Sequence, residues 1–153
     1  MNYKVDINGD KCWYKEGHLH REDGPAIEYT NGDKAWYKEG NHHRIGGPAI
    51  EWADGYREWY VEGKIHRIGG PAIEYADGSK YWYKDGFLHR EDGPACDNIN
   101  GHKEWYKEGD RHRIDGPAIE FTSGYKVYFY LDKRIDCNSD EEYFKLLKLK
   151  AFW

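Results

Sequence analysis

The sequence predicts an all-β fold: an elongated single-layer antiparallel sheet of 23-residue β-hairpin units with a C-terminal capping helix. Two recurring features predict it. A glycine returns every 23 residues, at Gly9, Gly32, Gly55, Gly78, Gly101 and Gly124. A His-Arg-x-x-Gly-Pro-Ala element keeps the same spacing, with its first two residues at His20-Arg21, His43-Arg44, His66-Arg67, His89-Arg90 and His112-Arg113. A period of about 20–50 residues indicates stacked units that share one continuous core.

Each unit is expected to contain two strands. In the first unit, residues 10–15 and 25–30 are rich in aromatic or β-branched residues and are bounded by turn residues. Consecutive units are joined by Asn-Gly, Asp-Gly or Ser-Gly pairs. Asn-Gly and Asp-Gly favour two-residue type I′ turns, because both central residues of that turn need a positive φ. The Glu16-Gly17 pair inside the unit is expected to form a looser connection.

A two-residue turn fixes the register of the strands and therefore their faces. Around Asn31-Gly32 it pairs Ile27 with Trp36, and the next hairpins repeat that pair. The opposite face alternates alanine with tyrosine and sets Glu51 opposite Glu58, like charges that are tolerable only in water. We therefore predict that isoleucine and tryptophan line the core face.

The C-terminal part departs from the repeat. The repeat array is expected over residues 1–136, with units starting near residues 9, 32, 55, 78, 101 and 124, and a helical cap over residues 137–153. Ser139 and Glu142 form a capping box that opens a helix through about Lys150. Tyr143, Phe144, Leu146 and Leu147 give this helix an apolar face. The helix can cover the last strand and protect the open sheet edge, or it can bind a partner.

Composition and charge limit the class of protein. A chain of 153 residues fits one domain, and its 17% aromatic residues must supply much of the buried area. The net charge of −5 argues against a nucleic-acid partner, which usually requires a basic balance. Neither a signal-peptide pattern nor an apolar run long enough to span a bilayer is found, so we expect a cytoplasmic protein. An odd number of cysteines without a C-x-x-C pair also fits a reducing compartment: Cys12, Cys96 and Cys137.

The first unit carries a family resemblance. The pattern Trp13-Tyr14-x-x-Gly17-x-x-His20-Arg21-x-x-Gly24-Pro25-Ala26, ending in Asn31-Gly32, resembles the MORN repeat and more closely its variant class. The resemblance covers about residues 1–136. It departs at the corner of the unit, the His-Arg-x-x-Gly stretch before the second strand, where Arg21 takes the place of the usual glycine and a proline follows Gly24. It implies an elongated antiparallel sheet, a non-enzymatic scaffold or binding role, and frequent self-association. Units with this signature are similar to those of phages and large DNA viruses, which implies a viral origin.

The recurring His-Arg pairs have two interpretations. Arginine recognises phosphate and carboxylate bidentately, so the row can bind an anion. Alternatively, a residue that recurs in every unit can be structural, with the arginine bonding to turn carbonyls or a nearby aspartate. The units differ, because Arg21 and Arg90 are followed by Glu-Asp whereas Arg44 and Arg67 are followed by Ile-Gly-Gly. An anion site is therefore expected at the latter pair, with the candidate residues His43, Arg44, His66, Arg67, Trp36 and Trp59.

Two functions from different classes remain open. One is a protein-interaction or inhibitor module with an aromatic face and cationic corners. The other is a sequestering protein that captures a phosphorylated or nucleotide-type small molecule between Trp or Tyr rings and Arg44 and Arg67. No metal site, cofactor or catalytic residue is expected, because no histidine set has metal-ligand spacing and no nucleophile is placed beside a base. A one-layer aromatic sheet leaves apolar area exposed, so we expect a homodimer or a higher closed oligomer.

Overall fold

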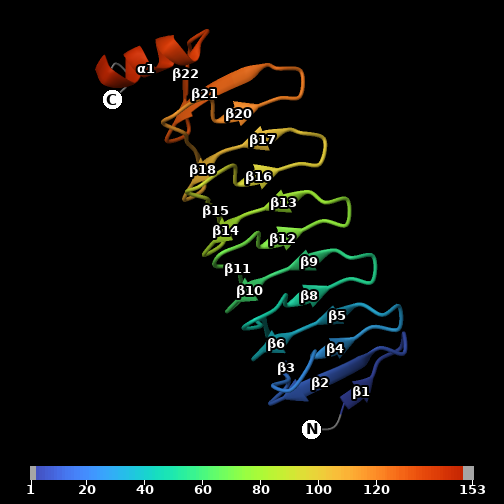
Figure 1. Ribbon diagram of the computed structural model, residues 1–153. Coiled ribbons are helices and arrows are strands. Elements are labelled where there is room, and N and C mark those ends of the chain that lie inside the picture. The colour runs from blue at the N-terminus through green and yellow to red at the C-terminus, as the bar shows by residue number, and fades with distance from the viewer. Residues whose placement is uncertain (1–2, 150–153) are drawn as a thin grey trace.

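The computed structural model describes residues 3–149 and shows an elongated stack of β-hairpins that ends in α1 (Asp140–Leu149) (Figure 1). These residues contain one 14-stranded antiparallel sheet whose strands follow chain order, with β3 paired to β2 beside the main path. The predicted fold class is therefore confirmed. The strands of the main path are β1 (Tyr3–Val5), β2 (Lys11–Lys15), β4 (Ile27–Glu28), β5 (Lys34–Ala35), β8 (Ile50–Glu51), β9 (Arg57–Glu58), β12 (Ile73–Glu74), β13 (Lys80–Tyr81), β16 (Cys96–Asp97), β17 (Lys103–Glu104), β20 (Ile119–Glu120), β21 (Lys126–Tyr130) and β22 (Lys133–Ile135).

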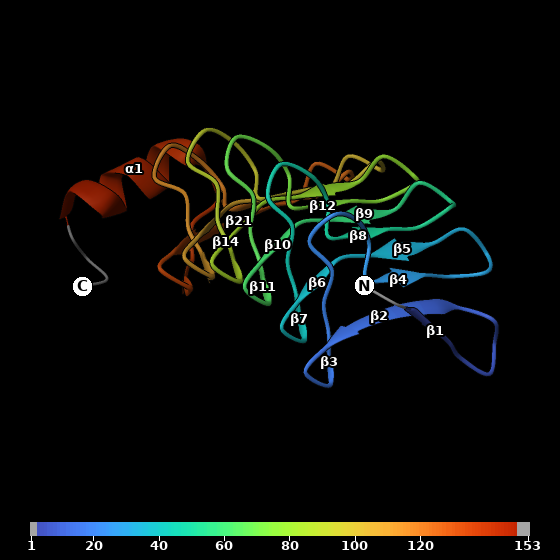
Figure 2. The same ribbon diagram turned by 90° about the horizontal axis from the view of Figure 1, so that it is seen from below.

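Shorter hairpins lie beside this long sheet, as the view from below shows for β6, β7, β10 and β11 (Figure 2). In the first unit β3 pairs with the end of β2, and in each of the next four units a two-stranded hairpin takes the same place. These strands are β3 (His18–Leu19), β6 (Tyr37–Lys38), β7 (Asn41–His42), β10 (Tyr60–Val61), β11 (Lys64–Ile65), β14 (Tyr83–Lys84), β15 (Phe87–Leu88), β18 (Tyr106–Lys107) and β19 (Asp110–Arg111).

The hairpins between units have three-residue loops, so the predicted register is wrong by one residue. At the second tip the Gly32 N–H donates to the Tyr29 carbonyl (3.0 Å), and the Tyr29 N–H donates to the Asp33 carbonyl (3.0 Å). Residues 30–32 therefore form the loop, and the other five tips repeat these two bonds. A type I′ turn needs a positive φ at Asn31 as well, but here Gly32 alone has one (94°). The loop is a type I turn followed by a left-handed glycine.

Type I′ geometry occurs instead at the turn inside each unit, which was predicted to be looser. Both Glu16 (φ 52°) and Gly17 (φ 83°) have a positive φ, and Lys15 pairs with His18 directly across the turn. A carboxylate residue followed by glycine keeps this conformation in the next four units, at Glu39, Glu62, Asp85 and Glu108.

The three-residue loops also change the faces of the sheet. Ile27 pairs with Ala35 rather than with Trp36, so the predicted isoleucine–tryptophan core face is wrong. Ile27 and Ala35 form a buried cluster with Cys12, and Leu19 and Tyr37 pack against it. Because successive side chains alternate between faces, Trp36 lies on the opposite face from Ala35 and Tyr37.

The observed register places opposite charges beside each other. Glu51 pairs with Arg57 and not with Glu58, and Asp97 pairs with Lys103. Charge alternates in sign at every step of this row, and each opposite-charge pair contributes about 0.2–1 kcal/mol. The charged row consists of Lys11, Glu28, Lys34, Glu51, Arg57, Glu74, Lys80, Asp97, Lys103, Glu120 and Lys126.

Helix α1 lies at the C-terminal end of the stack, next to β22 (Figure 1). Its predicted capping box is confirmed, because the Glu142 N–H donates to Ser139 Oγ (3.2 Å) while the Asn138 N–H donates to Glu142 Oε2 (2.9 Å). Tyr143 is fully buried against Tyr128 of β21 and Ile135 of β22. The helix thus covers the last strands, as predicted. Lys150, where the predicted helix ends, lies outside the described residues.

Candidate binding site

Each arginine of the repeated element is held over a tryptophan ring of its own unit. In the second unit, Arg44 Cζ lies 3.8 Å from the centroid of the Trp36 ring. Its Nη1 donates to the Pro48 carbonyl (3.0 Å) and to Glu51 Oε1 (2.6 Å). The stacking recurs at 3.8–4.1 Å for Arg21 on Trp13, Arg67 on Trp59, Arg90 on Trp82 and Arg113 on Trp105.

The glycine and proline of the element serve the same arginine. A Cβ added to Gly47 would lie 2.9 Å from Arg44 Cζ, so the guanidinium packs directly on the glycine backbone. The carbonyl of Pro48 is the acceptor described above. The Gly-Pro pair therefore recurs because the arginine needs a close backbone approach and a free carbonyl.

The histidines connect neighbouring units. His43 Nδ1 accepts a hydrogen bond from the Glu62 N–H (3.1 Å), the first residue of the type I′ turn in the next unit. His66 Nδ1 makes the same bond with the Asp85 N–H (3.1 Å). The bond also recurs at His20, His89 and His112, with donors at Glu39, Glu108 and Leu131. These contacts support the structural interpretation of the histidines.

The structure divides the candidate residues between two neighbouring hollows. A hollow of about 510 Å³ between the second and third units is lined by Arg44, Trp59, His66 and Arg67, together with apolar residues. Trp36 and His43 line the preceding hollow of about 690 Å³, which Arg44 also borders. Four of the six candidate residues thus line one hollow, and the other two line its neighbour.

Arg44 and Arg67 have carboxylate partners that the sequence analysis missed. Glu51 accepts from Arg44, and Glu74 accepts from Arg67 Nη1 (2.8 Å). These glutamates follow the arginines by seven residues and lie on β8 and β12. The available signal was a glutamate that recurs at this place in four of the five elements, where the fourth unit has Asp97.

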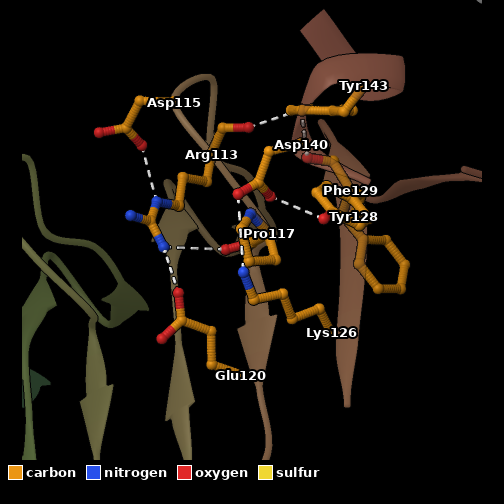
Figure 3. Close-up of polar contacts among 9 residues, drawn as sticks. All are labelled: Arg113, Asp115, Pro117, Glu120, Lys126, Tyr128, Phe129, Asp140 and Tyr143. Atoms are coloured by element: carbon orange, nitrogen blue, oxygen red, sulfur yellow. Dashed lines mark hydrogen bonds and ion pairs between the residues drawn. The ribbon is translucent and has the colours of Figure 1, made fainter. Parts of the chain in front are cut away.

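The arginines still differ at Nε. In the fifth unit Arg113 Nε donates to Asp115 (2.7 Å), while Nη1 donates to Pro117 and Glu120 (Figure 3). Arg21 and Arg90 likewise donate Nε to Asp23 (2.9 Å) and Asp92 (2.8 Å). These bonds lower the pKa of the Asp23 and Asp92 carboxyls. The second and third units have Gly46 and Gly69 in place of this aspartate.

A row of aromatic side chains lies on the isoleucine face of the sheet, and it gives the expected aromatic face its residues. Trp52 contacts Tyr56 (4.5 Å between ring centroids), Tyr56 contacts Tyr75 (5.1 Å) and Tyr75 contacts Tyr81 (5.4 Å). Trp52 is 48% exposed and Tyr75 is 42% exposed. The signal for this aromatic row was the ring that recurs just before the hairpin tips, as at Tyr29, Trp52, Tyr75 and Phe121.

Burial raises the pKa of the Cys96 thiol to about 12 and that of Cys137 to about 11, so neither is poised as a thiolate. Residues 3–149 contain no group of three or more metal-ligating side chains, and no helix among them is long and apolar enough to cross a membrane.

Comparisons with known proteins do not add a function. No protein-family model matches the chain, and no curated protein matches it significantly. The resemblance to MORN repeats thus depends on the repeated residues themselves.

Proposed function

We propose that this protein is a non-enzymatic binding module that recognises a protein partner through the aromatic row. The observation that carries the proposal is the continuous contact from Trp52 through Tyr56 and Tyr75 to Tyr81, on a face that exposes two of these rings. Exposed apolar patches mark interaction surfaces, and Trp and Tyr supply much of the binding energy at such surfaces.

The geometry of the arginines favours this function over sequestration of a nucleotide-type molecule. Such a ligand would need a free tryptophan face to stack its base. Arg44 and Arg67 already occupy one face of Trp36 and of Trp59, at 3.8 Å from the ring centroids. The same arginines donate to Glu51 and Glu74, whose charges oppose a second anion beside Nη1.

The resemblance and the cysteines support a cellular setting for the proposed function. A MORN-like array of phage type fits an inhibitor or scaffold that binds a host protein. The free thiols of Cys12, Cys96 and Cys137 fit a cytoplasmic location, where thiols stay reduced.

Native mass spectrometry of the protein purified from its source organism tests the function. The unmodified protein should retain a protein partner, and the double variant Trp52→Ser/Tyr75→Ser should lose it. Ile7→Ser is the matched control, because Ile7 is 99% exposed at a hairpin tip away from the row. A retained small molecule without a protein, or equal retention by all three forms, would contradict the proposal.

A further inference from the structure

We propose that Arg44 and Arg67 hold two acidic side chains of the protein partner, each on the Nε edge of its guanidinium. This inference rests on the proposed function, because it names the chemistry of the partner. It assigns a specific task to the second and third units, which differ from the other three complete units at one loop position.

The chain itself shows how a carboxylate is held at this edge. Asp23, Asp92 and Asp115 each accept a hydrogen bond from the Nε of the arginine two residues before them, at 2.7–2.9 Å. In Figure 3 the Asp115 carboxylate approaches Arg113 from the side opposite to Glu120. The two edges of one guanidinium are thus occupied by two different carboxylates.

In the second and third units the first of these carboxylates is missing. Arg44 and Arg67 keep their Nη1 bonds, but Gly46 and Gly69 stand where the aspartate would be. The arginine side chains are correspondingly more exposed, 32% for Arg44 and 31% for Arg67 against 19–22% in the other three units.

The electrostatic surroundings favour an incoming carboxylate. Within the described chain, the hollow between the second and third units is lined by both arginines and by His66, without Asp or Glu. The hollows next to the first and fifth units include Asp23 or Asp115 in their lining. Gly69 lines the next hollow along, so the two free edges lie one unit apart. That hollow also contains Glu91 and Asp92, and Asp92 is already bonded to Arg90 Nε, so the carboxylate-free surroundings belong to the Arg44 edge.

Apolar side chains surround the free edges. Ile45 (84% exposed) and Ile68 (89% exposed) occupy the place that Glu22 and Glu91 take in the first and fourth units. This exchange removes a competing charge. It also offers apolar contacts that would exclude water from a bound carboxylate, and charge-assisted hydrogen bonds strengthen as water leaves.

The geometry favours a carboxylate over a phosphate. With Nη1 engaged, Nε and Nη2 present two parallel N–H groups, which match the two oxygens of one carboxylate. Glu51 and Glu74 lie on the other edge and would repel a dianion more than a monoanion.

The repeat also sets the spacing of the partner's acidic residues. Two strands per unit at about 4.8 Å each separate the two arginines by about 10 Å. A polyproline II segment advances about 3.1 Å per residue with three residues per turn, so acidic residues three apart lie on one side about 9 Å apart. We therefore infer an extended acidic segment with this spacing.

NMR observation of the arginine Nε–H signals tests the inference without the natural partner. The probes are sodium acetate and the blocked peptides Pro-Pro-Glu-Pro-Pro-Glu-Pro-Pro and Pro-Pro-Glu-Pro-Pro-Gln-Pro-Pro, at constant ionic strength. The signals of Arg44 and Arg67 should shift, while those of Arg21, Arg90 and Arg113 stay in place. The peptide with two glutamates should bind about tenfold more tightly than the peptide with one, because the second contact is intramolecular.

The chain provides a matched variant. Gly46→Asp turns the second unit's element into the sequence His-Arg-Ile-Asp-Gly-Pro-Ala-Ile-Glu of the fifth unit. Gly46 has a positive φ (83°) and Asp115 does not, so the variant loop must change to the conformation that the fifth unit already shows. Gly46→Asp/Gly69→Asp should remain folded and abolish the response to acetate and peptide. The reciprocal variant Asp115→Gly should make the Arg113 signal respond as well.

Three results would overturn the inference: an equal response of all five arginines, no response of Arg44 and Arg67, or tighter binding of inorganic phosphate than of the two-glutamate peptide. None of these results concerns the aromatic row. Failure here is therefore distinguishable from failure of the proposed protein-binding function, which Trp52→Ser/Tyr75→Ser tests.

Discussion

Arg67 makes three kinds of contact inside its own unit. Its guanidinium lies 3.8 Å from the Trp59 ring centroid, and its Nη1 donates to the Pro71 carbonyl (2.9 Å) and to Glu74 (2.8 Å). Because this single side chain joins the tryptophan strand, the corner and the following strand, the fold depends on it whatever it binds.

Arg67→Ala should lower the free energy of unfolding by about 1–3 kcal/mol. The substitution removes a cation–π contact of about 0.5–1 kcal/mol and charge-assisted hydrogen bonds of about 1.5–3 kcal/mol, discounted because the pair is partly exposed. Arg134→Ala is the control, since Arg134 is 60% exposed and contacts Asp136 at 3.5 Å. Urea unfolding measures both, and equal small losses would argue against a structural role of Arg67.

The histidines predict a dependence of stability on pH. His112 Nδ1 accepts the Leu131 N–H, which requires an unprotonated Nδ1. Burial lowers the pKa of His112, and Lys107 adds to this effect while Asp110 opposes it. The Tyr130 ring packs against the imidazole at 4.8 Å. A lowered pKa means that the unfolded chain takes up the proton first as the pH falls.

The contribution of His112 to the free energy of unfolding should therefore be complete above about pH 6.5, the ordinary histidine pKa. It should decline as the pH falls through the lowered pKa of the folded protein. NMR titration of the ring should give a midpoint below that of a free histidine. In His112→Gln the free energy of unfolding should depend less on pH between about 7.5 and 5 than in the unmodified protein. A raised midpoint would contradict the assigned hydrogen bond.

At the level of the strands, the three-residue loops and the charged row explain each other. With a three-residue loop, Glu74 lies between Arg57 and Lys80, and Asp97 lies between Lys80 and Lys103. A two-residue loop would shift the pairs across each tip by one position and bring Glu51 opposite Glu58 and Asp97 opposite Glu104. The register is thus supported both by the turn conformation and by cross-strand electrostatics.

Lys80→Glu tests the charged row directly. The variant places Glu74, a glutamate at position 80 and Asp97 side by side, and should lower the free energy of unfolding by about 1–2 kcal/mol. The loss should shrink at about 1 M salt, where the Debye length is about 3 Å. Lys84→Glu on β14 is the control, because Lys84 is exposed and outside the row. Equal losses in the two variants at low salt would contradict the observed register.

How much the sequence could predict differs between elements. The period of the glycines predicted the hairpin stack, and the pair Ser139 and Glu142 predicted the helix start, because each is a local pattern with one structural solution. The register was wrong because Asn31-Gly32 fits both a type I′ turn and a type I turn followed by a left-handed glycine. The expected clash of Glu51 with Glu58 was the signal against the first choice.

The candidate site was predicted in part for a related reason. The difference between Arg44 and Arg21 is visible in the residues that directly follow them. The partners Glu51 and Glu62 follow Arg44 and His43 by seven and nineteen residues, across strands whose register the sequence did not fix. Without those contacts, the sequence cannot distinguish His-Arg pairs with a structural role from His-Arg pairs that bind an anion.

Over the whole molecule, α1 closes one end of the stack. The Tyr143 hydroxyl donates to the Arg113 carbonyl (2.6 Å) and, at 3.3 Å, to the Phe129 carbonyl, and its ring lies 5.0 Å from that of Tyr128 (Figure 3). Asp140 at the start of the helix accepts from the Tyr128 hydroxyl (2.7 Å) and contacts Lys126. Tyr143 of the helix therefore joins the fifth unit, through Arg113, to the sixth unit, through Phe129.

Tyr143→Phe should cost about 1–3 kcal/mol, because two carbonyls lose a buried donor, and Tyr143→Ala about 3–5 kcal/mol. In a repeat stack each unit contacts only its neighbours, so the effect should be local. Hydrogen exchange should show faster exchange in β20 to β22 and little change in β4 and β5. Uniform acceleration along the chain would contradict a local cap.

The end of the stack opposite α1 leads to the last prediction, self-association. β1 is the terminal strand of the described sheet, all three of its residues are exposed, and residues 3–149 provide no strand for its outer edge. Such an edge is a template for pairing, and two antiparallel copies form a closed twofold contact, whereas α1 prevents addition at the other end. We therefore expect a homodimer by light scattering.

Tyr3→Lys/Val5→Lys should give a monomer, because like charges would face each other, while Ile7→Lys at the nearby tip should remain dimeric. A monomer of the unmodified protein at every accessible concentration would refute this arrangement.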